Sequence, residues 1–307
     1  MESFPYFLND VRVLFAMFAV CIVWYFGIVS EMKQSSVLNL PRWLSGGMGN
    51  LMRSVGEKVL GLSLEHNVEE LSTQQSLLGV HPHGVLCTAS TFFGGYLFNV
   101  KMKMKGRYMF PCVADVLFRI PIVGEFCLLN GARSMNHHVL DRLLQCGNSI
   151  AMYPGGMYEQ VHTEPSAEVL YFAPKLGFIR VAIRNGVPLQ PSYVFGENQL
   201  YSQNCLTRFL NRSMKRFFGL GSFFMVGRFG LLWPVCRPRP LYWHFGNVID
   251  VGCAEAAPSE ERVRDVFVRY VAELQRIFKD HAPAHLPADV AAKGLTIVWR
   301  VHDKELR

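Results

Sequence analysis

The feature that most constrains this chain is an uncharged segment of seventeen residues near its start, residues 13–29. Charged side chains bracket the segment on both sides: Asp10, Arg12, Glu31 and Lys33. A helix needs about 17 to 25 apolar residues to cross the hydrocarbon core of a bilayer, so the segment is just long enough. We therefore expect a membrane anchor in residues 1–34, followed by one folded domain in residues 35–307.

A cleaved secretory signal is the alternative interpretation of this segment. Two acids precede its only arginine, Arg12, the uncharged core is longer than usual, and no small-x-small cleavage site follows, so an anchor is favoured. Lys33, Arg42 and Arg53 follow the segment, whereas Arg12 and the terminal amine precede it. The positive-inside rule then predicts that the domain faces the cytosol.

The composition excludes a disordered chain and indicates a membrane partner. Half of the residues are apolar, while charged residues make up 18%, below the roughly 25% of an ordinary soluble domain. The eight cysteines are never closer together than fifteen residues, so they form no zinc knuckle or redox pair. We expect them to be reduced thiols.

A repeated pattern of apolar run, polar loop and helical segment predicts an α/β fold, with a mixed sheet flanked by helices. Three runs are expected to be strands, residues 77–80, 149–153 and 187–195, and a loop with Gly or Pro follows each. Ligands collect at the carboxyl ends of strands in such sheets, so the three loops should form one site.

Helices and a linker complete the predicted organisation. Leucines at helical spacing end at Gly147, a second apolar face ends at Gly186, and Ser259 caps a long helix at the end of the domain. The Gly, Ser and Pro residues of 40–50 predict a linker between anchor and domain.

His81-Pro82-His83-Gly84 is the sharpest local feature of the sequence. A neutral imidazole at a strand end can take a proton from an alcohol hydroxyl, which makes either histidine a candidate general base. Two hydrogen-bonded structural histidines are the alternative, and a metal site is a third interpretation. The metal would need further ligands, for which the sequence offers His137, His138, His162 and His244.

The second loop, residues 153–159, places Gly155 and Gly156 before Glu159. Backbone N–H groups at such glycines can bind an oxyanion or a phosphate, and Glu159 can orient the base histidine. The third loop brings Glu197 and Asn198 to the same edge. No Gly-x-Ser-x-Gly elbow, Walker loop, dinucleotide fingerprint or zincin motif occurs in the sequence.

The stretch between Asn198 and Val248 contains seven basic and no acidic residues, interleaved with aromatic residues. The basic residues are Arg208, Arg212, Lys215, Arg216, Arg228, Arg237 and Arg239. Nucleic acid, anionic headgroups and a phosphate-bearing cofactor are all suitable partners for such a mixture. The anchor favours a membrane surface or a cofactor, so we expect no nucleic-acid partner.

Four groups of motifs, in the order in which they occur along the chain, resemble the type 2 diacylglycerol acyltransferase family. That family includes monoacylglycerol, wax-ester and sterol acyltransferases. They are His81-Pro82-His83-Gly84; Phe118-Arg119-Ile120-Pro121 with Gly131-Ala132-Arg133-Ser134; Gly155-Gly156-Met157-Tyr158-Glu159; and Lys175-Leu176-Gly177-Phe178 with Phe195-Gly196-Glu197-Asn198. The resemblance covers the chain from about Ser76 to the last long helix. It implies a glycerolipid-acyltransferase-like fold, with transfer from acyl-CoA to a lipid hydroxyl.

The resemblance also implies roles for individual residues. His83 is the expected base, with Glu159 as its carboxylate partner and His81 as a further catalytic residue. Substrate contacts are implied for Pro82, Gly84, Arg133, Gly155, Gly156, Lys175, Gly196, Glu197 and Asn198. The chain departs from the wider superfamily, which has an Asp shortly after its His, because Cys87 and Thr88 stand there. It also keeps only Lys175 where relatives carry an Arg-rich approach, so the basic stretch after Asn198 could supply phosphate contacts.

The resemblance implies no metal and no cofactor other than acyl-CoA as co-substrate. It places the enzyme in the endoplasmic reticulum membrane, with lipid droplets as a further location, and diacylglycerol is the expected acceptor. A monoacylglycerol, a fatty alcohol or a sterol remains an alternative, as do a metal-dependent hydrolase and a non-enzymatic lipid-droplet protein. The sequence leaves open acyl-chain preference, a hairpin anchor and homo-oligomer formation.

Overall fold

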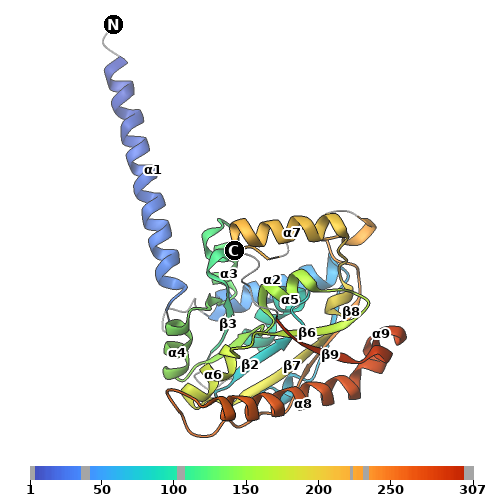
Figure 1. Cartoon of the computed structure of the whole chain (residues 1–307). Helices are drawn as coiled ribbons and strands as arrows, with labels where there is room; N and C mark the ends of the chain where they lie inside the picture. Colours follow the sequence, from blue (N-terminus) through green and yellow to red (C-terminus); the bar gives the residue numbers. More distant parts are fainter. Residues whose placement is uncertain (1–3, 36–41, 102–107, 222–223, 231–234, 301–307) are drawn as a thin grey trace.

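The computed structural model describes residues 4–35, 42–101, 108–221, 224–230 and 235–300. Helix α1 (Phe4–Met32) projects away from a domain in which helices cover both faces of a central sheet (Figure 1). Within the described ranges the main sheet has seven strands, in the order β1 (Ser63–His66), β8 (Pro240–Phe245), β7 (Leu189–Phe195), β2 (Leu77–His81), β5 (Ser149–Met152), β3 (Met109–Val113) and β4 (Arg133–Ser134).

The strand directions confirm the predicted mixed sheet. β7 and β8 are antiparallel, whereas the other neighbouring strands run parallel. The three strands predicted from the sequence correspond to β7, β2 and β5, which are neighbours in the sheet, so their carboxyl ends lie at one edge. β6 (Glu168–Phe172) and β9 (Leu295–Trp299) pair in a separate parallel sheet.

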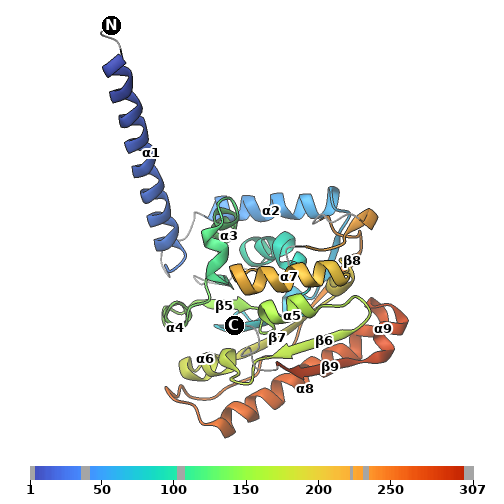
Figure 2. The same ribbon diagram turned by 45° about the horizontal axis from the view of Figure 1, so that its top comes forward.

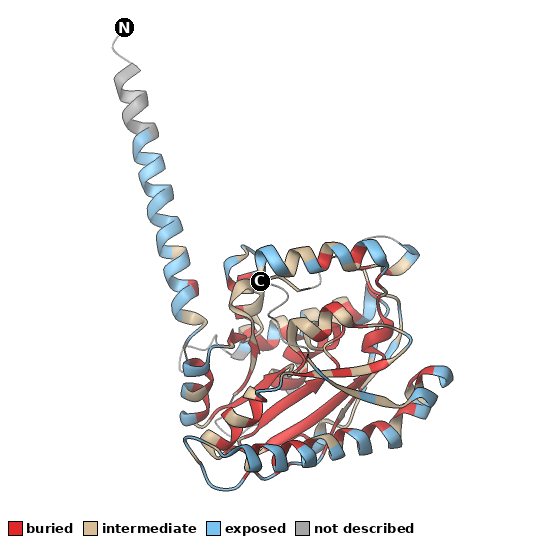
Figure 3. Ribbon diagram, viewed as in Figure 1, coloured by how far each residue is buried: buried red, intermediate tan, exposed pale blue. Residues whose placement is uncertain are grey.

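Alternating side chains of the strands build two cores, one on each face of the sheet. Leu77 packs on the side of α4 (His137–Gln145), α6 (Gly177–Asn185) and α8 (Glu260–His285), whereas Leu78 packs against the segment that follows the β2 loop. That segment contains two π-helical turns, η2 (Ser90–Gly94) and η3 (Leu97–Lys101). The strands of the main sheet are buried, and so are the helix faces that pack on them (Figure 3).

The predicted helix ends are confirmed. Gly186 adopts a left-handed conformation (φ 62°) directly after α6, and Gly147 does so (φ 77°) two residues after α4. The Ser259 hydroxyl accepts a hydrogen bond from the Arg262 N–H at 3.2 Å, so it caps α8 as expected. The remaining helical elements are α3 (Val123–Leu129), α5 (Gly156–His162), α7 (Cys205–Phe218), α9 (Ala288–Lys293), η1 (Val68–Glu70), η4 (Asp115–Arg119), η5 (Glu197–Gln199) and η6 (Arg228–Gly230).

The predicted linker in residues 40–50 is wrong where the structure describes it, because helix α2 (Arg42–Lys58) begins there. One glycine of this stretch, Gly49, serves packing. A Cβ at Gly49 would lie 2.6 Å from the carbonyl carbon of Gly95, so only glycine lets α2 approach the η2–η3 segment this closely.

Residues 12–32 of α1 form one helical stretch that is long and apolar enough to cross a membrane. At 1.5 Å per residue these 21 residues span about 32 Å, close to the roughly 30 Å hydrocarbon core. Most of their side chains are exposed, but Val29 is buried against Phe118 and Leu128, where the helix meets the domain near α3.

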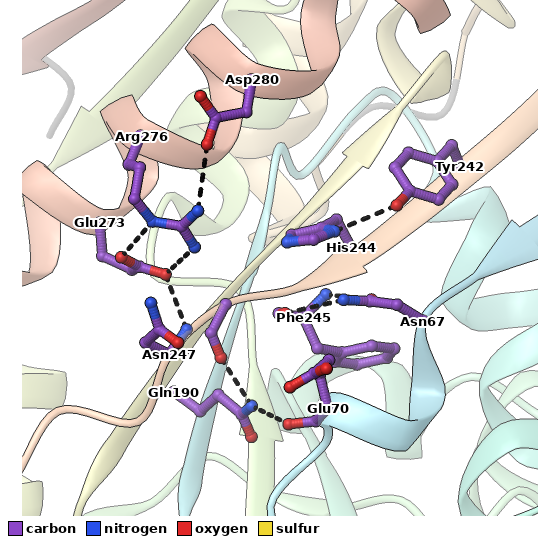
Figure 4. Close-up of polar contacts among 11 residues, drawn as sticks. Asn67, Glu70, Gln190, Tyr242, His244, Phe245, Asn247, Glu273, Arg276 and Asp280 are labelled. Carbon is purple, nitrogen blue, oxygen red and sulfur yellow. Dashed lines mark hydrogen bonds and ion pairs between the residues drawn. The ribbon is translucent and has the colours of Figure 1, made fainter.

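At the other end of β7, polar side chains fasten loops to the sheet (Figure 4). The Gln190 amide donates to the carbonyl oxygens of Glu70 and Gly246, both at 2.8 Å. On α8, Glu273 accepts a bond from the Asn247 N–H at 2.7 Å and pairs with Arg276 at 2.6 Å. These contacts hold the sheet from the edge opposite to the three polar loops.

Candidate active site

The loops after β2, β5 and β7 meet, as the sequence predicts. The His83 N–H donates to Glu159 Oε1 at 2.5 Å, which joins the β2 loop to the β5 loop. The Thr88 N–H donates to Glu197 Oε1 at 2.6 Å, which joins the β2 loop to the β7 loop. The segment around His83 is therefore held between two buried carboxylates.

The ring of His83 is held in one tautomer by the chain itself. Its Nδ1 lies 3.2 Å from the carbonyl oxygen of Gly84, which can only accept a hydrogen bond. This carbonyl favours the tautomer with the proton on Nδ1, which leaves Nε2 as an acceptor. Burial lowers the pKa of His83 to about 4, so the ring is neutral at physiological pH, and it packs against Tyr153 with 4.9 Å between ring centroids.

Cys87 lies beside the same ring, with its Sγ 3.2 Å from Nδ1 and 3.5 Å from Nε2 of His83. Burial raises the pKa of this thiol well above its usual range. The thiol is therefore protonated at physiological pH, which agrees with the absence of sequence support for a cysteine nucleophile.

Glu159 contacts the backbone of the β2 loop, and this differs from the ring contact expected for a carboxylate partner. Its Oε1 accepts from the His83 N–H, and its Oε2 accepts from the Tyr171 N–H at 2.9 Å. The carboxylate can fold back in this way because residue 155 is a glycine. A Cβ at Gly155 would lie only 2.2 Å from Oε2. Burial raises the pKa of Glu159 to about 7.

Gly156 completes the turn before α5 with a positive φ of 53°. Its N–H donates to the Tyr153 carbonyl oxygen at 3.1 Å, so this N–H is used within the turn instead of facing a ligand. Of the two glycines, Gly155 makes room for Glu159 and Gly156 supplies the backbone conformation.

Glu197 caps the helical segment that follows the histidines. Its two oxygens accept from the N–H groups of Thr88 and Ala89 at 2.6 and 2.9 Å. Gly84, with φ 61°, allows this approach because it has no Cβ. A Cβ there would lie 2.6 Å from Glu197 Cγ. Gly196 turns the chain into this position with φ 92°. A direct substrate contact by Gly84, Gly196 or Glu197 stays a prediction.

The sequence analysis missed Glu168, the first residue of β6. Its buried carboxylate accepts hydrogen bonds from the Tyr193 hydroxyl (2.7 Å) and from the amides of Asn198 (2.7 Å) and Gln199 (2.8 Å). Asn198 is thereby fixed within the protein. The signal available in the sequence was an acidic residue, Glu168, at the start of a short run of strand-forming residues, 168–172.

His81 lies behind the site, fully buried, with Nε2 2.9 Å from the Tyr270 hydroxyl. Burial lowers its pKa to about 3, so the ring is neutral. Pro82, also buried, follows it through a cis peptide bond. The Tyr270 contact holds this ring at the end of β2, and a direct chemical step by His81 stays a prediction.

Arg300 also went unnoticed in the sequence. It follows β9, and its Nη2 donates to the carbonyl oxygen of Pro154 at 2.9 Å and to that of Gly155. The guanidinium also lies over the Tyr158 ring, 5.8 Å from its centroid. The turn that carries Glu159 is therefore held by a residue from the end of the domain.

Two predicted substrate contacts lie apart from this cluster. Arg133 is buried on β4, where its guanidinium donates to the carbonyl oxygens of Ser35 and Ala132 and covers the Phe110 ring. Lys175 is exposed in the turn before α6. Their contacts with a substrate stay predictions.

The histidines considered as further metal ligands lie elsewhere: His137 and His138 are exposed at the start of α4, and the other two pack in separate ring clusters. His162 stacks on Tyr158, and His244 packs against His281. In the parts of the chain that the structure describes, no group of three His, Cys, Asp or Glu residues has an arrangement suited to a metal ion.

Comparison with known proteins places the chain in a family. The chain is 28% identical over 229 residues to diacylglycerol O-acyltransferase 2 of Xenopus tropicalis, covering 69% of this chain and 62% of that protein. It is 27% identical to human 2-acylglycerol O-acyltransferase 3 (67% and 64% covered) and 28% identical to human acyl-CoA wax alcohol acyltransferase 1 (73% and 69% covered). The match thus spans about three fifths of the length of the first of these relatives.

A solved structure of a 1-acyl-sn-glycerophosphate acyltransferase from Thermotoga maritima aligns with 90% of this chain and 99% of its own, at a TM-score of 0.42 and 18% identity. The model of the family described as diacylglycerol acyltransferase matches residues 13–291, which include the three loops and most of the domain. The chain therefore belongs to the diacylglycerol acyltransferase family.

Proposed function

We propose that this protein is an acyl-CoA-dependent O-acyltransferase that esterifies the hydroxyl of a neutral lipid. The family supports this activity, and the names of its relatives specify diacylglycerol, 2-acylglycerol and wax alcohol as acceptors. Diacylglycerol is our proposed acceptor because the first relatives are diacylglycerol acyltransferases. Monoacylglycerol and fatty alcohol are the alternative acceptors.

The observation that carries the proposal is the state of His83, a neutral ring whose Nδ1 faces the Gly84 carbonyl oxygen, so that Nε2 is available to accept a proton. In our mechanism Nε2 takes the proton from the lipid hydroxyl while the hydroxyl oxygen attacks the thioester carbonyl carbon. The tetrahedral intermediate collapses, the carbon–sulfur bond breaks, and the CoA thiolate takes the proton from the imidazolium. A base with a low pKa releases that proton readily, so no acyl-enzyme is needed.

A pair of hydroxyl groups beside His83 is suited to stabilise the oxyanion. Ser90 Oγ and Tyr153 Oη lie 2.6 Å apart, so one hydroxyl hydrogen is shared between them and the other is left to bind a ligand. The Tyr153 ring packs against the His83 ring, with 4.9 Å between ring centroids, which supports a role for the second hydrogen at the reacting atoms. A donor aimed at the developing charge contributes about 3 to 4 kcal/mol to such a reaction.

We further propose that the protein works at the cytosolic face of the endoplasmic reticulum membrane or on lipid droplets. Helix α1 is long enough to cross a bilayer, and α7 adds exposed apolar side chains: Leu206, Phe209, Phe217 and Phe218. Figures 1 and 2 show that α1 extends from the side of the domain that carries α3, with α2 and α7 nearby. A membrane here would bring both amphiphilic substrates to the loops.

The test is acyl transfer by membranes that contain the full chain, with labelled oleoyl-CoA and a panel of monoacylglycerol, diacylglycerol, fatty alcohol and sterol. We expect triacylglycerol from diacylglycerol, and at least a hundredfold lower rate in His83→Gln at equal protein level. A His83→Gln protein that retains its rate would refute the base mechanism, and a membrane that makes no ester from any acceptor would refute the activity.

A further inference from the structure

A cavity of about 290 Å³ lies beside α5, on the side of that helix where α7 packs. The end of α5, strand β6, the loop after β7 and α7 form its walls. The side chains that give these walls their chemistry are His162, Thr163, Glu164, Tyr171, Asn198, Arg208 and Arg212. Figure 2 shows α7 running alongside α5, as the walls require.

The walls carry a net positive charge, because Arg208 and Arg212 of α7 line them against a single acid, Glu164. Arg208, Arg212 and Lys215 recur every three or four residues, so they share one face of the helix. Lys215 lies over the Tyr158 ring at 4.9 Å, and Arg208 pairs with Glu164 at 2.9 Å. Among the described residues Arg212 has no acidic partner within ion-pair distance, so its charge is free to meet an anion.

The neighbouring histidine responds to this charge. The pKa of His162 is lowered, first by burial and then by the nearby positive charges of Arg212, Lys215 and Arg208. The ring is therefore neutral at physiological pH, and with Tyr171 it supplies aromatic surface next to the cations. Anionic groups and flat heterocycles both find contacts in such walls.

One carboxylate connects this cavity with the candidate active site. Tyr171, whose side chain lines the cavity, donates its N–H to Glu159 Oε2, while Glu159 Oε1 accepts from His83. The cavity and the base thus lie on two sides of a single side chain.

We propose that this cavity binds the phosphate-bearing nucleotide end of acyl-CoA. The inference rests on the proposed function, in which acyl-CoA is the donor. The cavity is at the small end of the size range of ligand sites, so it holds one end of the donor and leaves the thioester outside. The same chemistry would also suit the phosphate of a lipid headgroup, and the experiment separates the two sources.

The experiment measures binding by the full chain in uncharged detergent micelles, using isothermal titration without turnover. The ligands are CoA, adenosine 3′,5′-bisphosphate and dihexanoyl phosphatidate. Arg212→Gln should weaken CoA and the bisphosphate about tenfold or more, the effect of losing a charge-assisted contact. The matched control is Arg216→Gln, which removes the same charge from α7 outside the cavity walls and should change affinity less than threefold.

Equal CoA affinity in Arg212→Gln and wild type would overturn the site, as would a variant that weakens phosphatidate while leaving CoA unchanged. In the transfer assay the variant should raise the KM for oleoyl-CoA and leave kcat within twofold. A wild-type protein without transfer activity would refute the proposed function, whereas the binding data judge the cavity by themselves.

Discussion

Glu159 contacts His83 through the backbone N–H of that residue and makes no hydrogen bond with its ring. The carboxylate oxygen lies 2.5 Å from the His83 nitrogen of the main chain, while the ring Nδ1 faces the Gly84 carbonyl 3.2 Å away. One carboxylate therefore fixes where the base stands, and a carbonyl fixes which of its nitrogens accepts a proton. In this arrangement the orientation of the ring comes from the β2 loop itself.

Gly155→Ala tests the placement of Glu159. The new Cβ would lie 2.2 Å from Oε2, so the carboxylate must rotate away and lose both N–H donors. We expect a stability loss of about 1 to 3 kcal/mol and at least a tenfold lower kcat, measured by thermal unfolding and acyl transfer. Gly177→Ala, where a Cβ meets nothing within 4 Å, is the control and should preserve both. Normal activity in Gly155→Ala would show that the contact is dispensable.

The pH dependence of kcat/KM reports the state of His83. With a pKa of about 4, the ring is neutral above about pH 5, so the acid limb of kcat/KM that belongs to His83 should lie toward pH 4. Glu159, whose pKa is about 7, is a separate source of pH dependence, so the profile is compared with that of Glu159→Gln. Both histidines have folded pKa values below the unfolded 6.5, so they add stability that is present above pH 6.5 and is lost as pH falls. Circular dichroism must therefore show that the protein is folded. An acid limb centred at pH 6.5 that persists in Glu159→Gln would contradict the buried neutral ring.

Tyr270→Phe distinguishes a structural His81 from a catalytic one. The substitution removes the hydroxyl 2.9 Å from Nε2 and leaves a buried nitrogen without its partner. We expect a lower melting temperature, equivalent to about 1 to 3 kcal/mol, and kcat per folded protein within threefold of wild type. A tenfold fall in kcat at unchanged stability would instead assign His81 to the chemistry.

The sequence was sufficient for the central strands and the meeting of their loops because each apolar run is local and ends in Gly or Pro. It was insufficient where glycines have a packing role: the glycines of residues 40–50 indicate a linker, yet Gly49 lets α2 contact Gly95 closely. The sequence was also insufficient to predict which side chains, distant along the chain, form hydrogen bonds in the folded domain. Glu168 binds three side chains from 25 to 31 residues away, and the local strand pattern marks the acid but not the residues with which it pairs.

Tyr153→Phe tests the hydroxyl pair proposed to stabilise the oxyanion. The change removes one of the two hydroxyl groups, so no shared hydrogen bond fixes the Ser90 hydroxyl toward the reacting carbonyl. We expect kcat to fall about tenfold to a thousandfold while the KM for oleoyl-CoA changes little, because the contact forms in the transition state. Ser90→Ala should give a loss of the same kind. A change confined to KM would assign both hydroxyls to substrate binding.

Arg300→Gln tests the contribution of the segment after β9. The guanidinium binds the Pro154 and Gly155 carbonyl oxygens, and its charge adds to burial in lowering the pKa of His83. We therefore expect about tenfold lower kcat, and an acid limb of kcat/KM that moves to higher pH, because the imidazolium is repelled less. Arg269→Gln, which removes an exposed cation from α8, should change neither. A lower rate with an unmoved acid limb would mean that Arg300 supports the turn without influencing the charge of the base.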